Sequence, residues 1–313
     1  MPREEFKQAL KNKEFGDFVA MYRPFWNTGG EMGNWDEELI SLLPPSCKIF
    51  TSAGAGFDWV DTKRLARSGI IYCNAAAACT ESVADAAIWL ILSTYRLFSW
   101  SSQAARSLSV SAFKDANRNI AATTSNPRNS ILGIIGLGKI GYLVAQKAKA
   151  ALGMKIVYND IRRIPEDIEK TVDATFYPKL EDLLAVADCT VVATPFGGEK
   201  VLSAASFQYF KPGSRIVNVA RGKLIDEPAL VEALESGRLF AAGLDVHYDE
   251  PVVNQKLAKM RNVEMLSHTA GASVDSHVGF ERLGIENILS FFEMGKALTP
   301  VNMHWMENNA SKL

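Results

Sequence analysis

The stretch SILGIIGLGKIGYLVAQKAKAALG, residues 130–153, decides the fold, because it contains an apolar strand, a glycine loop and a helix in direct succession. The loop consists of Gly136, Leu137, Gly138, Lys139, Ile140 and Gly141. Its glycines allow a tight turn and a close approach of a pyrophosphate, while the helix start offers N–H donors and the positive end of a dipole. In this context the G-x-G-x-x-G pattern predicts a dinucleotide-binding unit, which the pattern alone would not.

Short apolar runs alternate with helical segments on both sides of this stretch. Strand character is found in CKIFTS at residues 47–52, IIYCN at 70–74, CTVVATP at 189–195, SRIVNVA at 214–220, AAGLDVH at 241–247 and VEMLSH at 263–268. Such alternation is typical of parallel sheets. We predict an α/β fold with two Rossmann-like doubly wound domains and a cleft between them. Residues 102–273 would form the dinucleotide-binding domain, and residues 1–101 with 274–313 the substrate domain.

Two further segments bear on the organisation. A helix that starts at Glu81 and runs to about Arg106 is apolar on all sides near its middle, which indicates a core or a subunit contact. We expect a homodimer through this helix, with Trp89 and Trp100 as anchors, since two-fold dimers are the commonest oligomers. The polar segment 107–129 is interpreted as a crossing between domains.

Composition excludes several classes of protein. The chain has 313 residues and a formal net charge of −1, so neither nucleic acid nor an anionic membrane is an expected partner. No apolar run reaches the roughly 18 to 20 residues of a spanning helix, and the polar start is no export signal. Four cysteines and four histidines in no ligand spacing indicate reduced thiols, no metal site and a cytoplasmic location.

The cofactor preference depends on three residues after the glycine loop. Asp160 ends the next apolar strand, where an acidic residue accepts hydrogen bonds from the adenosine ribose and repels a 2′-phosphate. NAD(H) is therefore favoured. Arg162 and Arg163 follow closely and could pair with such a phosphate, which leaves NADP(H) open.

Three charged residues far apart in the sequence each follow a predicted strand. They are Arg221 in VNVARG, Glu250 in LDVHYDEP and His268 in LSHTAG. Ligands of open parallel sheets collect at the carboxyl ends of the strands, so these side chains are expected to meet there. Beside a nucleotide, a cation, a carboxylate and an imidazole can bind a keto acid and deliver a proton to it.

These residues lie within motifs that resemble the D-isomer-specific 2-hydroxyacid dehydrogenases over nearly the whole chain. The motifs are SAGAGFDWVD, TESVADAAIWLIL, GLGKIG, KPGSRIVNVARG, AAGLDVHYDEP and SHTAG, and the nearest likeness is to the D-mandelate dehydrogenase and glyoxylate or hydroxypyruvate reductase branch. The resemblance implies that Arg221 holds the substrate carboxylate and polarises the keto oxygen. It implies that His268 is the general acid and that Glu250 binds the far nitrogen of His268.

The resemblance also implies a set of ligand contacts. The backbone N–H groups of Ala55 and Gly56 would receive the substrate carboxylate, next to Arg221 and His268. Asp245 would contact the nicotinamide carboxamide, and Thr194 with Pro195 would lie beside the nicotinamide ribose. The other implied cofactor neighbours are Val219, Ala220 and Gly271.

Departures from the family pattern bear on activity. About one βα unit that usually precedes the first segment is expected to be absent, which would shorten the N-terminal domain. The loop FGGEKVLSAASFQYF after Pro195 is about two residues short, and Ala270 stands where many members have glycine. Cofactor affinity and activity could suffer from these changes.

The sequence thus predicts an NAD(P)-dependent oxidoreductase that reversibly reduces a 2-keto acid to the (R)-2-hydroxy acid. If Phe25, Trp26 and Trp35 line the cleft, a bulky or aromatic side group would fit. Formate dehydrogenases resemble this chain but carry glutamine where Glu250 stands. The alternative is an NAD-binding co-repressor-like or scaffold protein with weak or no turnover.

Overall fold

The computed structural model describes residues 1–24 and 32–310, which contacts divide into two compact units. The first unit is Met1–Cys79 with Ala272–Leu313, and the second is Thr80–Gly271. The second unit therefore begins about twenty residues before the predicted boundary at residue 102. The physical reason is that the helix after Thr80 packs on the second sheet: a Cβ added at Gly243 would lie 3.1 Å from Cβ of Leu90.

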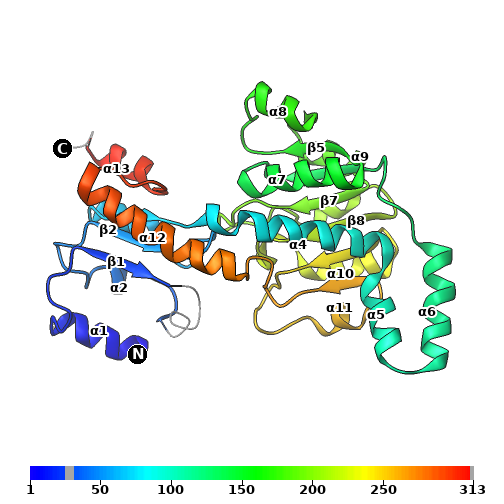
Figure 1. The fold of residues 1–313 in the computed structure, drawn as a ribbon, viewed down its shortest axis with the longest axis horizontal. Coiled ribbons are helices and arrows are strands. Elements are labelled where there is room, and N and C mark those ends of the chain that lie inside the picture. Colours follow the sequence, from blue (N-terminus) through cyan, green and yellow to red (C-terminus); the bar gives the residue numbers. More distant parts are fainter. Residues whose placement is uncertain (25–31, 311–313) are drawn as a thin grey trace. The chain divides into compact units, whose positions relative to one another are not determined.

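The first unit is built on a three-stranded parallel sheet in the order β1-β2-β3. Its strands are β1 (Ala20–Arg23), β2 (Ile49–Ser52) and β3 (Ile71–Cys73), and its helices are α1 (Arg3–Lys11), α2 (Glu37–Ile40), α3 (Thr62–Arg67), α12 (Val274–Met294) and α13 (Met303–Ala310) (Figure 1). Trp35, Phe50 and Tyr72 form the centre of its core, with ring centroids 4.8 Å and 5.6 Å apart for successive pairs. Trp35 is thus a core residue and not part of a ligand-lining loop, because only 3% of it is exposed. The predictions for Phe25 and Trp26 fall outside the described residues.

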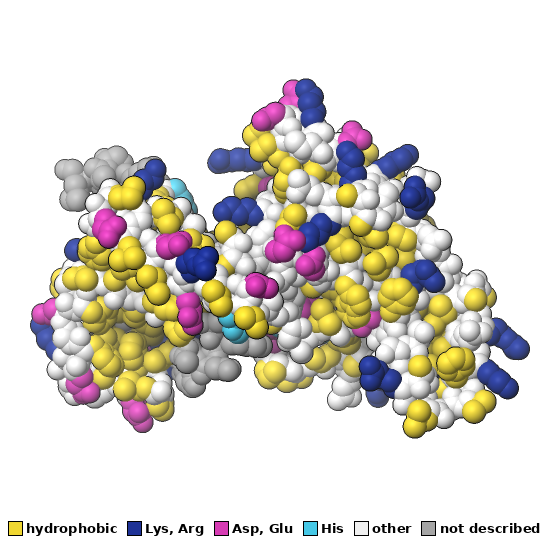
Figure 2. Space-filling view, in the orientation of Figure 1, with side chains coloured by type: hydrophobic (Ala, Val, Ile, Leu, Met, Phe, Trp, Pro, Cys, Tyr) yellow, Lys and Arg dark blue, Asp and Glu magenta, His cyan; other side chains and the backbone are white. Residues whose placement is uncertain are grey.

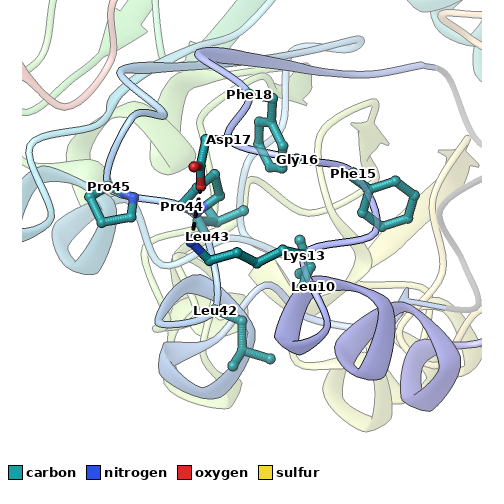
Figure 3. A pocket seen from close by; sticks show the side chains of 10 residues that line it. All are labelled: Leu10, Lys13, Phe15, Gly16, Asp17, Phe18, Leu42, Leu43, Pro44 and Pro45. Atoms are coloured by element: carbon teal, nitrogen blue, oxygen red, sulfur yellow. Dashed lines mark hydrogen bonds and ion pairs between the residues drawn. The ribbon is translucent and has the colours of Figure 1, made fainter.

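A pocket of about 130 Å³ lies in the first unit between the end of α1 and residues 42–45. Its lining is mostly apolar, and Figure 3 shows Lys13 reaching toward Asp17, with their charged atoms 3.5 Å apart. The lining segments precede β1 and β2 in the chain, so the pocket lies at the amino ends of these parallel strands. Ligands of such sheets bind at the carboxyl ends, and this pocket is therefore not the predicted site.

The second unit is built on a seven-stranded parallel sheet in the order β10-β9-β8-β7-β4-β5-β6. Its strands are β4 (Ile131–Ile135), β5 (Lys155–Asn159), β6 (Ala174–Phe176), β7 (Cys189–Val192), β8 (Ser214–Asn218), β9 (Leu239–Leu244) and β10 (Val263–Met265). The strand order reverses between β4 and β7, and dinucleotides bind at such a switch point. The glycine loop follows β4, so it lies at this point.

Helices cover both faces of the second sheet, as in other doubly wound folds. They are α4 (Ala76–Arg96), α5 (Phe98–Arg106), α6 (Val110–Thr123), α7 (Lys139–Lys147), α8 (Glu166–Val172), α9 (Leu180–Val186), α10 (Glu227–Glu235) and α11 (Gln255–Lys259). Shorter helical turns are η2 (Ala148–Leu152), η3 (Ala204–Tyr209) and η4 (Gly222–Leu224). All four cysteines are buried and form no disulfide bond, as the sequence predicted.

Helix α4 differs from its prediction in two ways. It begins at Ala76 and ends at Arg96, because Leu97 takes a left-handed backbone conformation with φ of 52° and a new helix, α5, starts at Phe98. By length and composition α4 could also cross a membrane, contrary to the expectation that no segment would. This is weak evidence, since the core helix of a globular domain passes the same test, and Leu90 and Ile91 are wholly buried.

The segment 107–129 is not a simple crossing, because α6 occupies most of it. Helices α5 and α6 pack against each other and leave a hollow of about 250 Å³. Leu108 is 92% exposed and Phe113 57% exposed at this hollow. Figure 2 shows acidic and basic side chains both spread over the visible face.

Candidate functional site

Three neighbouring strands of the second sheet carry the predicted catalytic residues. Arg221 follows β8, Glu250 follows β9 and His268 follows β10. These strands are adjacent and parallel in the order β8-β9-β10, so their carboxyl ends lie side by side. The sequence-predicted residues therefore leave the sheet at one edge, although 47 positions separate the first from the last in the chain (268 − 221).

His268 and Glu250 form a direct pair. Nδ1 of His268 lies 2.7 Å from Oε2 of Glu250, and the other carboxylate oxygen accepts the backbone N–H of His247 at 2.8 Å. Burial opposes ionisation of Glu250, but the hydrogen bonds from His268 and His247 outweigh it and hold the pKa of this carboxyl below its ordinary value. A carboxylate at Nδ1 leaves Nε2 of the imidazole for another partner and stabilises the protonated ring.

The backbone of His268 is held in an unusual conformation. Its φ is +57°, in the left-handed region that a non-glycine residue rarely adopts. Asp245 supports it: the main-chain oxygen of Asp245 accepts the His268 N–H at 2.8 Å, and Oδ1 accepts those of Thr269 and Ala270 at 2.8 and 2.9 Å. Asp245 is buried, which raises the pKa of its carboxyl despite these bonds. In the structure it thus fixes the segment that carries the imidazole.

Arg221 is tied to the same region through its neighbours. The Nη1 atom of Arg221 donates to the Ala220 carbonyl at 2.8 Å, and the Asn218 side-chain amide donates to the Arg221 carbonyl, also at 2.8 Å. A Cβ at Gly222 would lie 2.0 Å from the His247 carbonyl carbon, so the backbone after Arg221 packs directly on that of His247. Sequence reasoning missed Asn218, Gly222 and the supporting backbone of His247. The one available signal was the glycine that directly follows Arg221.

The glycine loop has the shape that a pyrophosphate requires. A Cβ at Gly141 would lie 2.1 Å from the Gly136 carbonyl oxygen, whereas a Cβ at Gly138 would meet nothing within 4 Å. Gly138 is exposed directly before α7, so its open side can take a ligand group at the helix start. Oδ2 of Asp160 accepts the Leu137 N–H at 2.9 Å, which places this carboxylate against the loop. These residues fit a bound dinucleotide.

The remaining predicted cofactor neighbours lie around the same loop or at the same edge of the sheet. A Cβ at Gly136 would lie 3.0 Å from Cα of Thr194, so the segment with Thr194 and Pro195 packs on the loop. Val219 donates its N–H to the Val192 carbonyl at 3.3 Å, and Ala220 follows it. Lys139 and Ile140 open α7, and Gly271 closes the second unit after His268.

Ala55 and Gly56 belong to the first unit, in the turn after β2. Their carbonyls are occupied: the Asn74 amide donates to Ala55 at 2.8 Å and the Trp59 indole to Gly56 at 3.2 Å. Among residues 1–24 and 32–310, no acceptor is found for the N–H of either. Two partly exposed N–H groups without a protein acceptor in one turn suit an anionic ligand, which is the role that the family resemblance implies.

The described part of the chain was compared with what metal ligands and reactive thiols require. No group of three or more His, Cys, Asp or Glu residues there could hold a metal ion. Burial raises the pKa of Cys47 to about 11 and that of Cys189 to about 12, so neither thiolate is populated at neutral pH.

The chain is similar to known proteins in sequence and in fold. A family model described as "D-isomer specific 2-hydroxyacid dehydrogenase, NAD binding domain" matches residues 88–270. The 4-methyl-2-oxopentanoate reductase A of Aspergillus oryzae is 36% identical over 303 residues, which cover 96% of this chain and 88% of that protein.

Two solved structures extend the comparison. The D-mandelate dehydrogenase of Rhodotorula graminis is 41% identical, with a TM-score of 0.92 over 96% of this chain and 88% of that one. An NADPH-dependent glyoxylate/hydroxypyruvate reductase from Sinorhizobium meliloti, solved with NADP and malonate, is 31% identical, with a TM-score of 0.76 over 92% and 85%. A cofactor of the NAD(P) type is therefore supported, with the predicted preference for NAD(H) consistent with the matched domain.

These matches do not favour the scaffold alternative, since the similar proteins are named as reductases and dehydrogenases. The matches extend over both units. They are therefore not limited to the glycine loop, a feature that many nucleotide-binding proteins share. The chain belongs to the D-isomer-specific 2-hydroxyacid dehydrogenases, oxidoreductases that reduce 2-keto acids to 2-hydroxy acids with NAD(P).

Proposed function

We propose that Arg221, Glu250 and His268 carry out the reduction of a 2-keto acid to its (R)-2-hydroxy acid. The observation that carries this assignment is the 2.7 Å contact between Nδ1 of His268 and Oε2 of Glu250. These residues follow β10 and β9, and β9 is the neighbour of β8, which Arg221 follows. Arg221 binds the substrate carboxylate and polarises the keto oxygen, because a guanidinium grips a planar carboxylate with two parallel bonds. His268 donates a proton from Nε2 to that oxygen, and Glu250 orients the imidazole and stabilises its charged form.

A dinucleotide bound at the glycine loop would supply the hydride that reaches the keto carbon. Gly136, Gly138, Lys139, Ile140 and Gly141 hold its pyrophosphate, and Asp160 accepts from the adenosine ribose. Thr194, Pro195, Val219, Ala220, Asp245 and Gly271 complete the set of proposed cofactor contacts. Asp245 would serve two purposes, because its Oδ1 already accepts hydrogen bonds from two backbone N–H groups. It supports the backbone after His268 and also contacts the cofactor.

The functional division of the chain is part of the same proposal. The second unit is the dinucleotide-binding domain, which the family match to residues 88–270 supports, and the first is the substrate domain. In the first unit, the N–H groups of Ala55 and Gly56 receive the substrate carboxylate. The two unoccupied donors in that turn support this role.

Several finer points are proposals of their own. A bulky side group on the substrate agrees with the names of two similar proteins, a 4-methyl-2-oxopentanoate reductase and a D-mandelate dehydrogenase. A homodimer through residues 81–106 is supported by Trp89, which is 41% exposed. Trp100 instead contacts Arg261 of its own subunit, whose Cζ lies 4.7 Å from the centroid of the Trp100 ring. We also propose that the protein is cytoplasmic and binds neither membranes nor nucleic acid.

The decisive experiment compares turnover with dinucleotide binding. NADH and NADPH oxidation would be followed with glyoxylate, hydroxypyruvate, phenylglyoxylate, phenylpyruvate and 4-methyl-2-oxopentanoate. The variant H268A should lose at least about a hundredfold in kcat, since a positioned general acid contributes that much or more. Its dissociation constant for NADH should stay within about twofold of the wild-type value. His268 follows β10, whereas the glycine loop that holds the pyrophosphate follows β4, so the substitution is remote from that loop.

A matched control replaces a histidine outside the site. H304A removes an imidazole from α13 of the first unit, where its ring centroid lies 4.7 Å from that of Trp305, and should leave kcat unchanged. Turnover in H268A equal to that of H304A would disprove the proton-donor role. Tight NADH binding without turnover of any 2-keto acid would instead restore the scaffold alternative.

A further inference from the structure

The loop between β5 and α8 is held by one buried carboxylate. Glu169 accepts two hydrogen bonds from the Arg163 guanidinium, one from Nε at 2.8 Å and one from Nη2 at 2.7 Å. The same carboxylate accepts the hydroxyl of Tyr158, a wholly buried residue of β5. The Glu169 side chain is 6% exposed, whereas that of Arg163 is 59% exposed. An acceptor with three charge-assisted or phenolic bonds fixes the arginine that it holds.

The loop that this cluster fixes is the one that carries the proposed ribose contact. Asp160 begins it and binds the glycine loop through the Leu137 N–H. Near its other end, the Ile164 N–H donates to the Tyr158 hydroxyl at 3.1 Å. Arg162 and Arg163 lie between these two anchors, directly after Asp160. Whether a 2′-phosphate can be bound therefore depends on the charges that these few residues present.

The charges in this loop cancel. Asp160 repels a phosphate, and Arg162, which has no ion pair among the described residues, offsets it. The charge of Arg163 is neutralised by Glu169, and Arg163 together with the Tyr158 hydroxyl holds the pKa of Glu169 at about 2. Glu169 thus stays ionised at any physiological pH, and its bidentate bond takes up one whole edge of the guanidinium.

We propose that Glu169 determines the dinucleotide preference of this enzyme, because it keeps Arg163 in an ion pair and so withholds it from the 2′-phosphate of NADP(H). The inference rests on the proposed binding of the adenosine ribose near Asp160. It assigns a role in specificity to a residue of α8 that itself touches no part of the ligand. Loss of its charge should release a guanidinium three positions after Asp160 to bind a phosphate.

The test measures binding and not turnover. Dissociation constants for NADH and NADPH would be determined by calorimetry for the wild type and for E169Q, which keeps the shape of the side chain. The ratio of the NADPH to the NADH constant should fall about tenfold in E169Q, as expected for one new charge-assisted bond to phosphate. In the double variant E169Q/R163A the ratio should return to the wild-type value, since the gain depends on the released arginine.

A matched control lies on the same helix. Glu166 is exposed and pairs with Lys170 at 2.9 Å, so E166Q removes the same charge without releasing Arg163. It should change the ratio by less than about twofold, because exposed charges are screened. A second check uses R163A alone, which should leave the wild-type ratio unchanged and does not depend on the folding of E169Q.

The results distinguish a failure of the role of Glu169 from a failure of the proposed cofactor site. If folded E169Q binds NADH normally and the ratio does not move, Glu169 has no role in specificity and the proposed site remains. If R163A alone weakens NADPH binding selectively, Arg163 already reaches the phosphate and the inference is wrong. If the wild type binds neither dinucleotide, the proposed cofactor site itself fails.

Discussion

At the scale of single residues, the charge of Glu250 is central to the site. Its pKa lies below the ordinary value of 4.5, because the bonds from His268 and His247 outweigh the cost of burial. A carboxyl with a lowered folded-state pKa stabilises the fold fully above its unfolded pKa and loses that contribution as the pH falls through the folded value. The carboxylate therefore remains available to the imidazole at all pH values above about 4.5.

This leads to a prediction for E250Q. The amide cannot stabilise a charged imidazole, so kcat should fall at least about tenfold while NADH binding is unchanged. The melting temperature of E250Q should lie below that of the wild type at pH 6, and the difference should shrink as the pH falls below 4.5. Kinetics and thermal melting at pH 3.5, 4.5 and 6 would measure both effects.

The neighbouring acid provides the control. D249N changes an exposed carboxylate one position earlier, and should match the wild type in kcat and in its pH dependence of melting. A melting difference between E250Q and the wild type that stays constant with pH would show that the carboxylate is not selectively stabilised in the folded state.

The residues of the site were predictable to the extent that each carries its own chemistry. Arg221, Glu250 and His268 are charged or titratable and each comes after an apolar strand, so they were expected at the same edge of the sheet. Asn218 and Gly222 act only through the backbone of other residues, and no residue type or spacing marks such a role. Arg163 looked free in the sequence because Glu169, its partner, lies on the next helix and the pair depends on how that helix packs.

At the scale of elements, the loop between β4 and α7 contains two glycines with opposite requirements. A Cβ at Gly141 would lie 2.1 Å from a backbone oxygen that cannot move, whereas one at Gly138 meets no protein atom. Gly138 has φ of −74°, which alanine adopts without strain. Gly141 is therefore required by the packing of the loop itself. Gly138 is not, and we expect it to be required for the close approach of the pyrophosphate.

The corresponding variants should behave differently. G141A should lower the free energy of unfolding by about 1 to 3 kcal/mol, as overpacking does. G138A should keep the wild-type stability but weaken NADH binding at least about tenfold, because its methyl group occupies the side from which the pyrophosphate approaches. Urea unfolding and calorimetric NADH titration would be compared for both. NADH binding by G138A as tight as by the wild type would mean that the pyrophosphate does not approach Gly138.

Elements were easier to predict than their ends. Six of the seven strands of the second sheet were predicted, because parallel strands buried on both faces appear in the sequence as continuous apolar runs between turns. The edge strand β6 was missed, since none of its three residues is fully buried. The break between α4 and α5 was missed, since the chain turns at Leu97, a residue that usually continues helices. Helix α6 was missed because its exposed, polar surface resembles that of a loop.

At the scale of the whole molecule, the first unit is formed by two segments that are nearly 200 residues apart in the chain. Asn302 joins them: its Oδ1 accepts the Tyr72 N–H at 2.9 Å, and its Nδ2 donates to the Thr62 and Ile70 carbonyls at 3.1 and 3.0 Å. The side chain is wholly buried, so water cannot replace these bonds. The return of the chain to the first unit was predicted, but the residue that anchors it was not.

This anchor allows the two units to be tested separately. N302A leaves two buried backbone groups, the Tyr72 N–H and the Ile70 carbonyl, without their partner and should destabilise the first unit by about 3 kcal/mol. Calorimetry should show a lower melting temperature for one of two transitions, by on the order of 10 °C, with the other unchanged. NADH binding should not change, since the glycine loop lies in the second unit. The exposed Asn12 provides the control, and N12A should melt as the wild type does. A single transition that shifts as a whole in N302A would instead mean that the two units unfold together, and substrate-domain variants could then not be interpreted independently of cofactor binding.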